Sequence, residues 1–139
     1  MDNGLRNERS FLAMCLAAPD AGEEALARID PEELLTGGVL RRVAGHLRGR
    51  LEQPLADLPE DDDELAAAIA ELMGRAARGG AVSADQLEHA RLLLELARLD
   101  RAIASARTRV GGEAGLGITD LARERQGVRE ALGAVVSRL

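Results

Sequence analysis

The sequence contains no lysine, tryptophan or tyrosine, and it has a single phenylalanine, Phe11, and a single cysteine, Cys15. The absence of lysine excludes a P-loop, a Schiff-base lysine and a Ser–Lys dyad. One cysteine permits neither an internal disulfide nor a cysteine-rich zinc framework. One aromatic residue leaves no platform on which nucleic-acid bases could stack. A net charge of -6 over 139 residues also argues against binding of the phosphate backbone as the main role.

The hydrophobic content is 46%, and leucine and alanine supply most of it, whereas β-branched residues are few. This composition favours helices over sheets. The apolar stretch 11–18 is much shorter than the roughly 20 residues that span a membrane, and no secretory signal is evident. We therefore expect a cytoplasmic, all-α protein of one domain, or of one small domain and an appendage, whose core is aliphatic.

Start and stop signals divide residues 1–80 into a bundle of short helices. A capping pattern begins at Asp30-Pro31, and glycine pairs at 37–38 and 79–80 end helices. Cys15 is expected to be a small buried hydrophobe, and the acidic run 60–64 is expected to cap a helix rather than bind a metal. The predicted helices cover residues 7–18, 20–29, a short segment after Pro31, 39–51, and a segment that follows the acidic run.

Residues 84–139 have a different character, because they predict an antiparallel helical hairpin. A capping box at 83–86 opens a long helix over 84–110, a glycine-rich turn follows at 111–117, and a returning helix covers 118–139. Each helix carries apolar residues at alternating steps of three and four. The seams consist of Leu92, Leu96, Leu99, Ile103, Ala106 and Val110, and of Ile118, Leu121, Arg125, Val128, Leu132, Val135 and Leu139. Arg125 interrupts the second seam and should therefore lie near solvent or meet an acidic partner.

No motif in the sequence carries catalytic chemistry. His46 and His89 are far apart and have no metal-binding context, and the glycine-rich segments lack flanking strands. We therefore predict no catalytic residue, no metal and no cofactor, and a role other than that of an enzyme. A ligand-binding or enzymatic helical bundle would need a cluster of polar residues within the bundle, and the sequence shows none.

The order of these elements resembles the C-terminal helicase-binding domain of bacterial DnaG-type primases. The resemblance covers nearly the whole chain and is carried by ERSFLAMCL at 8–16, IDPE at 29–32, the Arg41-Arg42 and His46-Leu47 helix, the proline loop 54–59, and LLEL at 93–96 continued by LDRAI at 99–103. It implies a helical bundle followed by a hairpin that docks on the N-terminal domains of the replicative DnaB-type helicase. Such a domain recruits primase to the replication fork and can stimulate the helicase. Primase itself is a DNA-directed RNA polymerase, but its zinc-binding and polymerase domains have no counterpart here, so we expect Met1 to begin an excised domain.

The end of the returning helix is the expected helicase contact, with Val136, beside the seam, as its outward anchor. These positions equally suit residues that only close the hairpin. The predicted contact set is Arg125, Arg129, Leu132, Val135, Val136 and Leu139. In some members of the family, basic residues also receive the acidic tail of single-strand-binding protein. Here only arginines are available for that role, and the predicted second surface is Arg41, Arg42, Arg48 and Arg50.

Two expectations concern assembly. As a primase domain, the chain should be a monomer alone, should bind protein at the replisome, and should bind neither a membrane nor, strongly, nucleic acid. The alternative is the N-terminal collar domain of a replicative helicase, or a related loader module, which would assemble into a trimer or hexamer.

Overall fold

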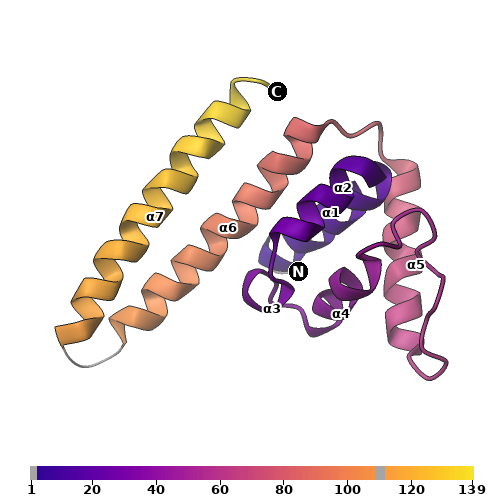
Figure 1. Cartoon of the computed structure of the whole chain (residues 1–139), viewed down its shortest axis with the longest axis horizontal. Coiled ribbons are helices and arrows are strands. Elements are labelled where there is room, and N and C mark those ends of the chain that lie inside the picture. Colours follow the sequence, from indigo (N-terminus) through magenta and orange to yellow (C-terminus); the bar gives the residue numbers. More distant parts are fainter. Residues whose placement is uncertain (1–2, 109–111) are drawn as a thin grey trace.

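The computed structural model describes residues 3–108 and 112–139, which form seven helices and no strand (Figure 1). The predicted all-α class is therefore confirmed. The helices are α1 (Asn3–Ala17), α2 (Pro19–Arg28), α3 (Pro31–Leu34), α4 (Gly38–Leu47), α5 (Asp63–Arg78), α6 (Ala84–Arg107) and α7 (Gly112–Val136).

Three helix starts are fixed by side-chain caps that satisfy free backbone N–H groups. The Asp30 carboxylate accepts a hydrogen bond from the Glu32 N–H at 3.0 Å at the start of α3. Asp62, within the predicted acidic run, accepts one from the Leu65 N–H at 3.1 Å at the start of α5. Ser83 and Gln86 form the predicted capping box of α6. These local signals act within three residues, which is why the sequence alone could locate them.

Helix α1 lies at the centre of the bundle, where it packs against α2, α4, α5 and α6. Its residues Phe11 and Leu12 are fully buried among leucines and isoleucines of the other helices. Each such side chain removed from water contributes about 1.5–3 kcal/mol. Cys15 is also fully buried, as predicted, and desolvation by its apolar surroundings raises the pKa of its thiol to about 12.

Helix α6 connects the two parts of the chain because its opposite faces pack against different helices. Leu87, Ala90 and Leu94 belong to the bundle core, whereas the buried Leu99 and Ile103 lie on the predicted seam with α7. The first half of α6 is thus part of the bundle. Its second half extends away from the bundle alongside α7 (Figure 1).

Helix α7 runs antiparallel to α6, but its bounds differ from the prediction. It begins at Gly112 instead of residue 118 and ends at Val136 instead of 139, so the predicted turn 111–117 is wrong from Gly112 onward. Glycine costs about 1 kcal/mol in a helix relative to alanine, and backbone hydrogen bonding in a continuous helix offsets that cost. Helix α6 ends at Arg107 instead of 110, while residues 109–111 lie outside the described part of the chain.

The predicted helix 39–51 is also too long, because α4 ends at Leu47. Two residues later Gly49 has a φ of 77°, a left-handed conformation that glycine adopts without steric cost and that interrupts a helix. Leu51 is nevertheless buried, as is expected from the apolar stripe that it forms at helical spacing with Leu40, Val43 and Leu47. The stripe identified core residues correctly but not the point where the helix stops.

Candidate functional site

Two large apolar side chains are exposed at and just after the C-terminal end of α7. Val136 is 54% exposed and Leu139 is 60% exposed, whereas Val135, which precedes Val136, is only 3% exposed. Leu132 is half-buried. The predicted contact set therefore divides: Val135 and Leu132 close the hairpin, while Val136 and Leu139 are available to a partner.

This exposure follows from how α7 is packed. Its main neighbour is α6, so only one face of the helix is covered (Figure 1). The seam residues Ile118, Leu121 and Val128 are consequently half-buried, although they occupy positions that would be buried in a larger bundle. Two paired helices bury too little apolar surface to be a stable unit in isolation. The hairpin therefore depends on the bundle through α6, and part of its apolar surface stays exposed.

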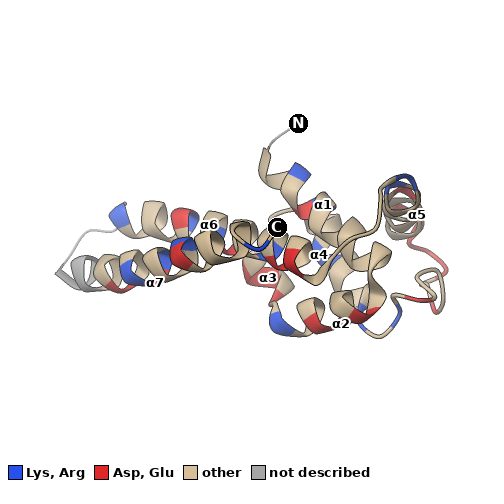
Figure 2. Cartoon of the chain, turned by 90° about the horizontal axis from the view of Figure 1, so that it is seen from above, with Lys and Arg blue, Asp and Glu red and all other residues tan. Residues whose placement is uncertain are grey.

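Ion pairs hold α7 in register on α6. Arg125, which interrupts the predicted seam, meets Asp100 with 2.6 Å between Nε and Oδ1, as the sequence led us to expect. Arg138 pairs with Asp85 at 3.3 Å, near the opposite end of α6. The remaining residue of the predicted contact set, Arg129, is exposed and forms no ion pair with any described residue. Charges of both signs are interspersed along the coloured parts of the two helices on the side seen in Figure 2.

A third ion pair across the hairpin joins Arg98 to Glu124 at 3.0 Å, and Arg98 also pairs with Glu95 on its own helix at 3.1 Å. Burial alone would lower the pKa of Arg98, but hydrogen bonds to Glu95 and Glu124 and the charges of both carboxylates outweigh it and raise that pKa. The guanidinium therefore stays charged and acts as a clamp between α6 and α7.

The four arginines of the predicted second surface do not form a free cationic patch. Arg41 Nε donates to the Leu35 carbonyl at 2.8 Å, and Arg48 donates to the carbonyls of Leu26 and Ile29 at the end of α2. Arg50 bonds the His46 carbonyl at 3.0 Å and pairs with an aspartate, Asp57, at 3.3 Å. Arginines in the last turn of a helix, or near its last carbonyls, complement the negative end of the helix dipole. These side chains stabilise the bundle.

The remaining member of that group, Arg42, joins α4 to the start of α5. It pairs with Glu64 at 2.8 Å and with Asp62 at 3.2 Å, and these hydrogen bonds, Glu64 first, raise the pKa of Arg42. The pKa of Asp62 is lowered, chiefly by the hydrogen bond from the Leu65 N–H and further by Arg42. The N-cap of α5 is thereby kept ionised.

A buried carboxylate that the sequence reasoning overlooked ties α1 to the start of α4. Glu8 is only 1% exposed, yet its carboxylate accepts hydrogen bonds from Thr36 N–H at 2.8 Å, Thr36 Oγ1 at 2.7 Å and Gly37 N–H at 3.1 Å. The sequence did indicate that Glu8 is buried, because it precedes Phe11 and Leu12 by three and four residues and so shares their buried face. Its role is structural.

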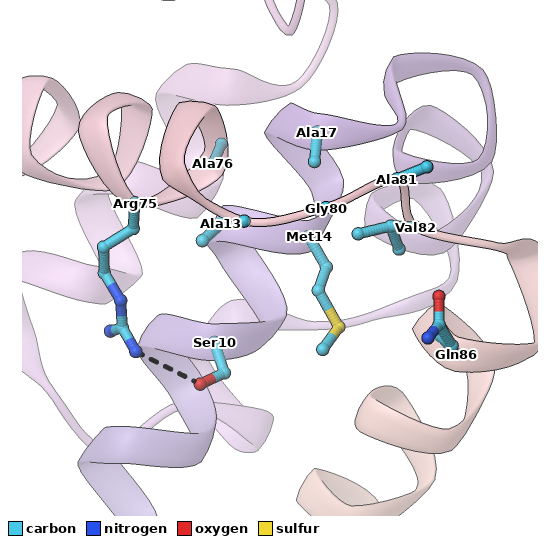
Figure 3. A pocket seen from close by; sticks show the side chains of 11 residues that line it. Ser10, Ala13, Met14, Ala17, Arg75, Ala76, Gly80, Ala81, Val82 and Gln86 are labelled. Carbon is cyan, nitrogen blue, oxygen red and sulfur yellow. Dashed lines mark hydrogen bonds between the residues drawn. The ribbon is translucent and has the colours of Figure 1, made fainter.

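A cleft of about 290 Å³ lies between α1, the end of α5 and the segment that leads to α6 (Figure 3). Arg75 stands at one end of the cleft, 3.5 Å from Ser10 Oγ, and Gln86 stands at the other, with the apolar Met14 and Val82 between them. Its lining holds no carboxylate, imidazole or thiol and so supplies neither a general base nor a metal ligand. The cleft can accommodate a small apolar side chain beside a cation.

Residues 3–108 and 112–139, the described part of the chain, show neither a metal-binding cluster nor a membrane-spanning helix. These residues contain no group of three or more His, Cys, Asp or Glu side chains placed to hold a metal ion. Within the same part of the chain, none of the helices is both apolar enough and long enough to cross a membrane.

No protein family, curated protein or solved structure matches the chain. The candidate site is therefore defined by its geometry alone: an apolar tip on a helix that one neighbour covers on one face.

Proposed function

We propose that the chain is a protein-interaction domain that binds the N-terminal domains of a replicative DnaB-type helicase and recruits a primase to the replication fork. The observation that supports this proposal is the packing of α7, which leaves Val136 and Leu139 more than half exposed at the C-terminus of the chain. Isolated apolar residues are common on surfaces, but here Leu139 continues the predicted seam of the returning helix and Val136 lies beside that seam. The resemblance of the sequence to primase helicase-binding domains supplies the identity of the partner.

The test replaces the exposed apolar tip and measures binding to the replicative helicase of the same organism by calorimetry. Val136→Asp places a charge where the partner would desolvate it, and we expect the Kd to rise at least about tenfold, which corresponds to about 1.4 kcal/mol. Leu55→Asp is the matched control, because Leu55 is a comparably exposed residue, at 48%, in the loop before α5. An unchanged Kd for Val136→Asp in a folded protein would contradict the proposal.

The alternative collar domain of a helicase predicts self-assembly instead of binding to a separate partner. Light scattering of the isolated chain separates the two. A monomer supports the primase domain, whereas a trimer or hexamer supports the collar.

The acidic tail of single-strand-binding protein remains a proposed second partner, but the arginines first assigned to it are engaged in the bundle. Arg41 and Arg48 bond backbone carbonyls, so their neutralisation should lower the melting temperature. A loss of tail binding without a loss of stability would restore them as a contact surface.

A further inference from the structure

Helix α7 is attached to the rest of the chain by a narrow apolar contact. Among the side chains of α7 that the structure describes, those of residues 117–136, only that of Val135 is buried, and the other apolar seam residues are half-buried. Helix α1, by contrast, carries the fully buried Phe11, Leu12 and Cys15. Because the free energy needed to separate two elements rises with the apolar area that becomes exposed, α7 leaves its neighbour more readily than α1 leaves the bundle.

The ion pairs between α6 and α7 do not compensate for this narrow contact. The charged side chains of the three pairs are 23–56% exposed, so water and salt compete with each pair. Surface ion pairs of this kind contribute little to stability, although their geometry fixes which residues of the two helices face each other.

Glycines inside α7 lower its stability further. The helix contains Gly112, Gly115, Gly117, Gly127 and Gly133, whereas α6, of nearly equal length, contains none. A glycine favours the helical over the unfolded state about fivefold less than an alanine does. At Gly117, Gly127 and Gly133 an added Cβ would meet no atom within 4 Å, so close packing does not require glycine there. These three glycines therefore weaken the helix without a gain in packing.

We infer that α7 is a strap that opens from α6 and closes again while α1–α5 and the first half of α6 stay folded. Opening uncovers the seam of α6, which includes Leu99 and Ile103, both buried in the closed state. The closed state alone holds Val136 and Leu139 at a fixed place on the surface, so a partner that binds them selects that state. Opening is a property of the chain alone, and the inference therefore goes beyond the proposed function without depending on it.

Amide hydrogen exchange of the full chain, followed residue by residue by NMR spectroscopy in D2O at neutral pH, measures the opening. The amides of Leu121 and Leu132 report on α7, whereas those of Phe11 and Leu12, at the centre of the bundle, report on global unfolding. We expect the protection factors on α7 to be at least about tenfold below those on α1. Equal protection factors on the two helices would overturn the inference, because α7 would then open only when the whole domain unfolds.

Two matched glycine-to-alanine substitutions test which parts unfold together. Gly45→Ala, in α4, stabilises the closed and the open state alike relative to the unfolded chain. It should raise the protection factors on α1 about two- to fivefold and leave those on α7 unchanged. Gly127→Ala stabilises the closed state alone, so it should raise the protection factors on both helices by about the same two- to fivefold. Both glycines are exposed and helical, and neither added Cβ would meet an atom within 4 Å, so the two substitutions are chemically equivalent.

The comparison of the two variants can overturn the inference in two ways. A rise of the protection factors on α7 in Gly45→Ala would show that α7 exchanges through global unfolding. An effect of Gly127→Ala at only one of the Leu121 and Leu132 amides, or at neither, would show that α7 does not open as one unit. The proposed function is tested separately, because hydrogen exchange of the chain alone involves no helicase and the Val136→Asp binding measurement does not depend on its outcome.

Discussion

Replacement of Glu8 by alanine is expected to destabilise the bundle more than any surface substitution. The carboxylate accepts three hydrogen bonds at 2.7–3.1 Å while only 1% exposed. Hydrogen bonds to a charged group contribute about 1.5–3 kcal/mol each, but Thr36 is exposed, so water can solvate part of what is released. We expect Glu8→Ala to lower the free energy of unfolding by about 3 kcal/mol. That is a large share of the total of about 5–15 kcal/mol typical of a domain.

Glutamine at the same position provides a sharper comparison. The two backbone N–H groups of Thr36 and Gly37 share Oε1, and only the Thr36 hydroxyl uses Oε2. In Glu8→Gln, the amide oxygen retains both backbone bonds, and the hydroxyl rotates to accept from the amide NH2. The loss should therefore be about 1 kcal/mol.

Urea unfolding, followed by the helical circular dichroism signal at neutral pH, measures both values. Glu24→Gln, an exposed glutamate on α2, is the control and should stay within about 0.5 kcal/mol. Equal losses for Glu8→Ala and Glu8→Gln would refute the assignment of hydrogen bonds. A loss below about 1 kcal/mol for Glu8→Ala would refute the structural role of the buried carboxylate.

Further predictions concern packing, caps and the thiol. Gly22→Ala should destabilise the protein by about 2 kcal/mol or more, because the new Cβ would lie 2.5 Å from the Cys15 carbonyl oxygen. Gly45→Ala, whose Cβ would have no atom within 4 Å, should stabilise the protein by about 0.5–1 kcal/mol. Urea unfolding of both variants measures the two changes. Ser83→Ala removes the capping box and should cost about 1 kcal/mol in the same assay. Because burial raises the pKa of Cys15 to about 12, the native thiol should react with iodoacetamide far more slowly than the thiol of the urea-unfolded chain at mildly alkaline pH; equal rates would contradict its burial. The raised pKa of Cys15 also contributes stability that is present below the unfolded thiol pKa of about 9 and is lost as the pH rises toward 12, so the urea midpoint should fall over that range.

The caps and core positions were predictable because their physics is local. Asp30, Asp62 and Ser83 act on N–H groups two or three residues away, and apolar spacing along one helix identifies its buried face. The stripe that includes Leu40 and Val43 is buried as its spacing indicated. Element type and core membership therefore followed from sequence pattern.

Helix ends were predicted less accurately from the sequence, because the helical and non-helical conformations of a terminal residue differ little in free energy. Glycines suggested a turn up to residue 117, yet α7 begins at Gly112, and α4 stops at Leu47 although its apolar stripe continues to Leu51. A free-energy difference of about 1 kcal/mol per glycine is enough to move a helix end, and contacts with the surrounding fold can provide a difference of that size.

The sequence by itself determined that this chain is helical and which faces of its helices are apolar. Only the tertiary structure decided which partners the charged side chains have. Arg48 reaches carbonyls 19 and 22 residues away, and Glu8 meets donors 28 and 29 residues away. The sequence pattern around a charged residue of a helix is the same whether its side chain faces solvent or a carbonyl of another helix. Hydrophobic periodicity identifies the buried face of a helix but not the hydrogen-bond partners of its charged residues. Packing therefore assigned the arginines near α4 to the bundle and left Val136 and Glu24 exposed to solvent.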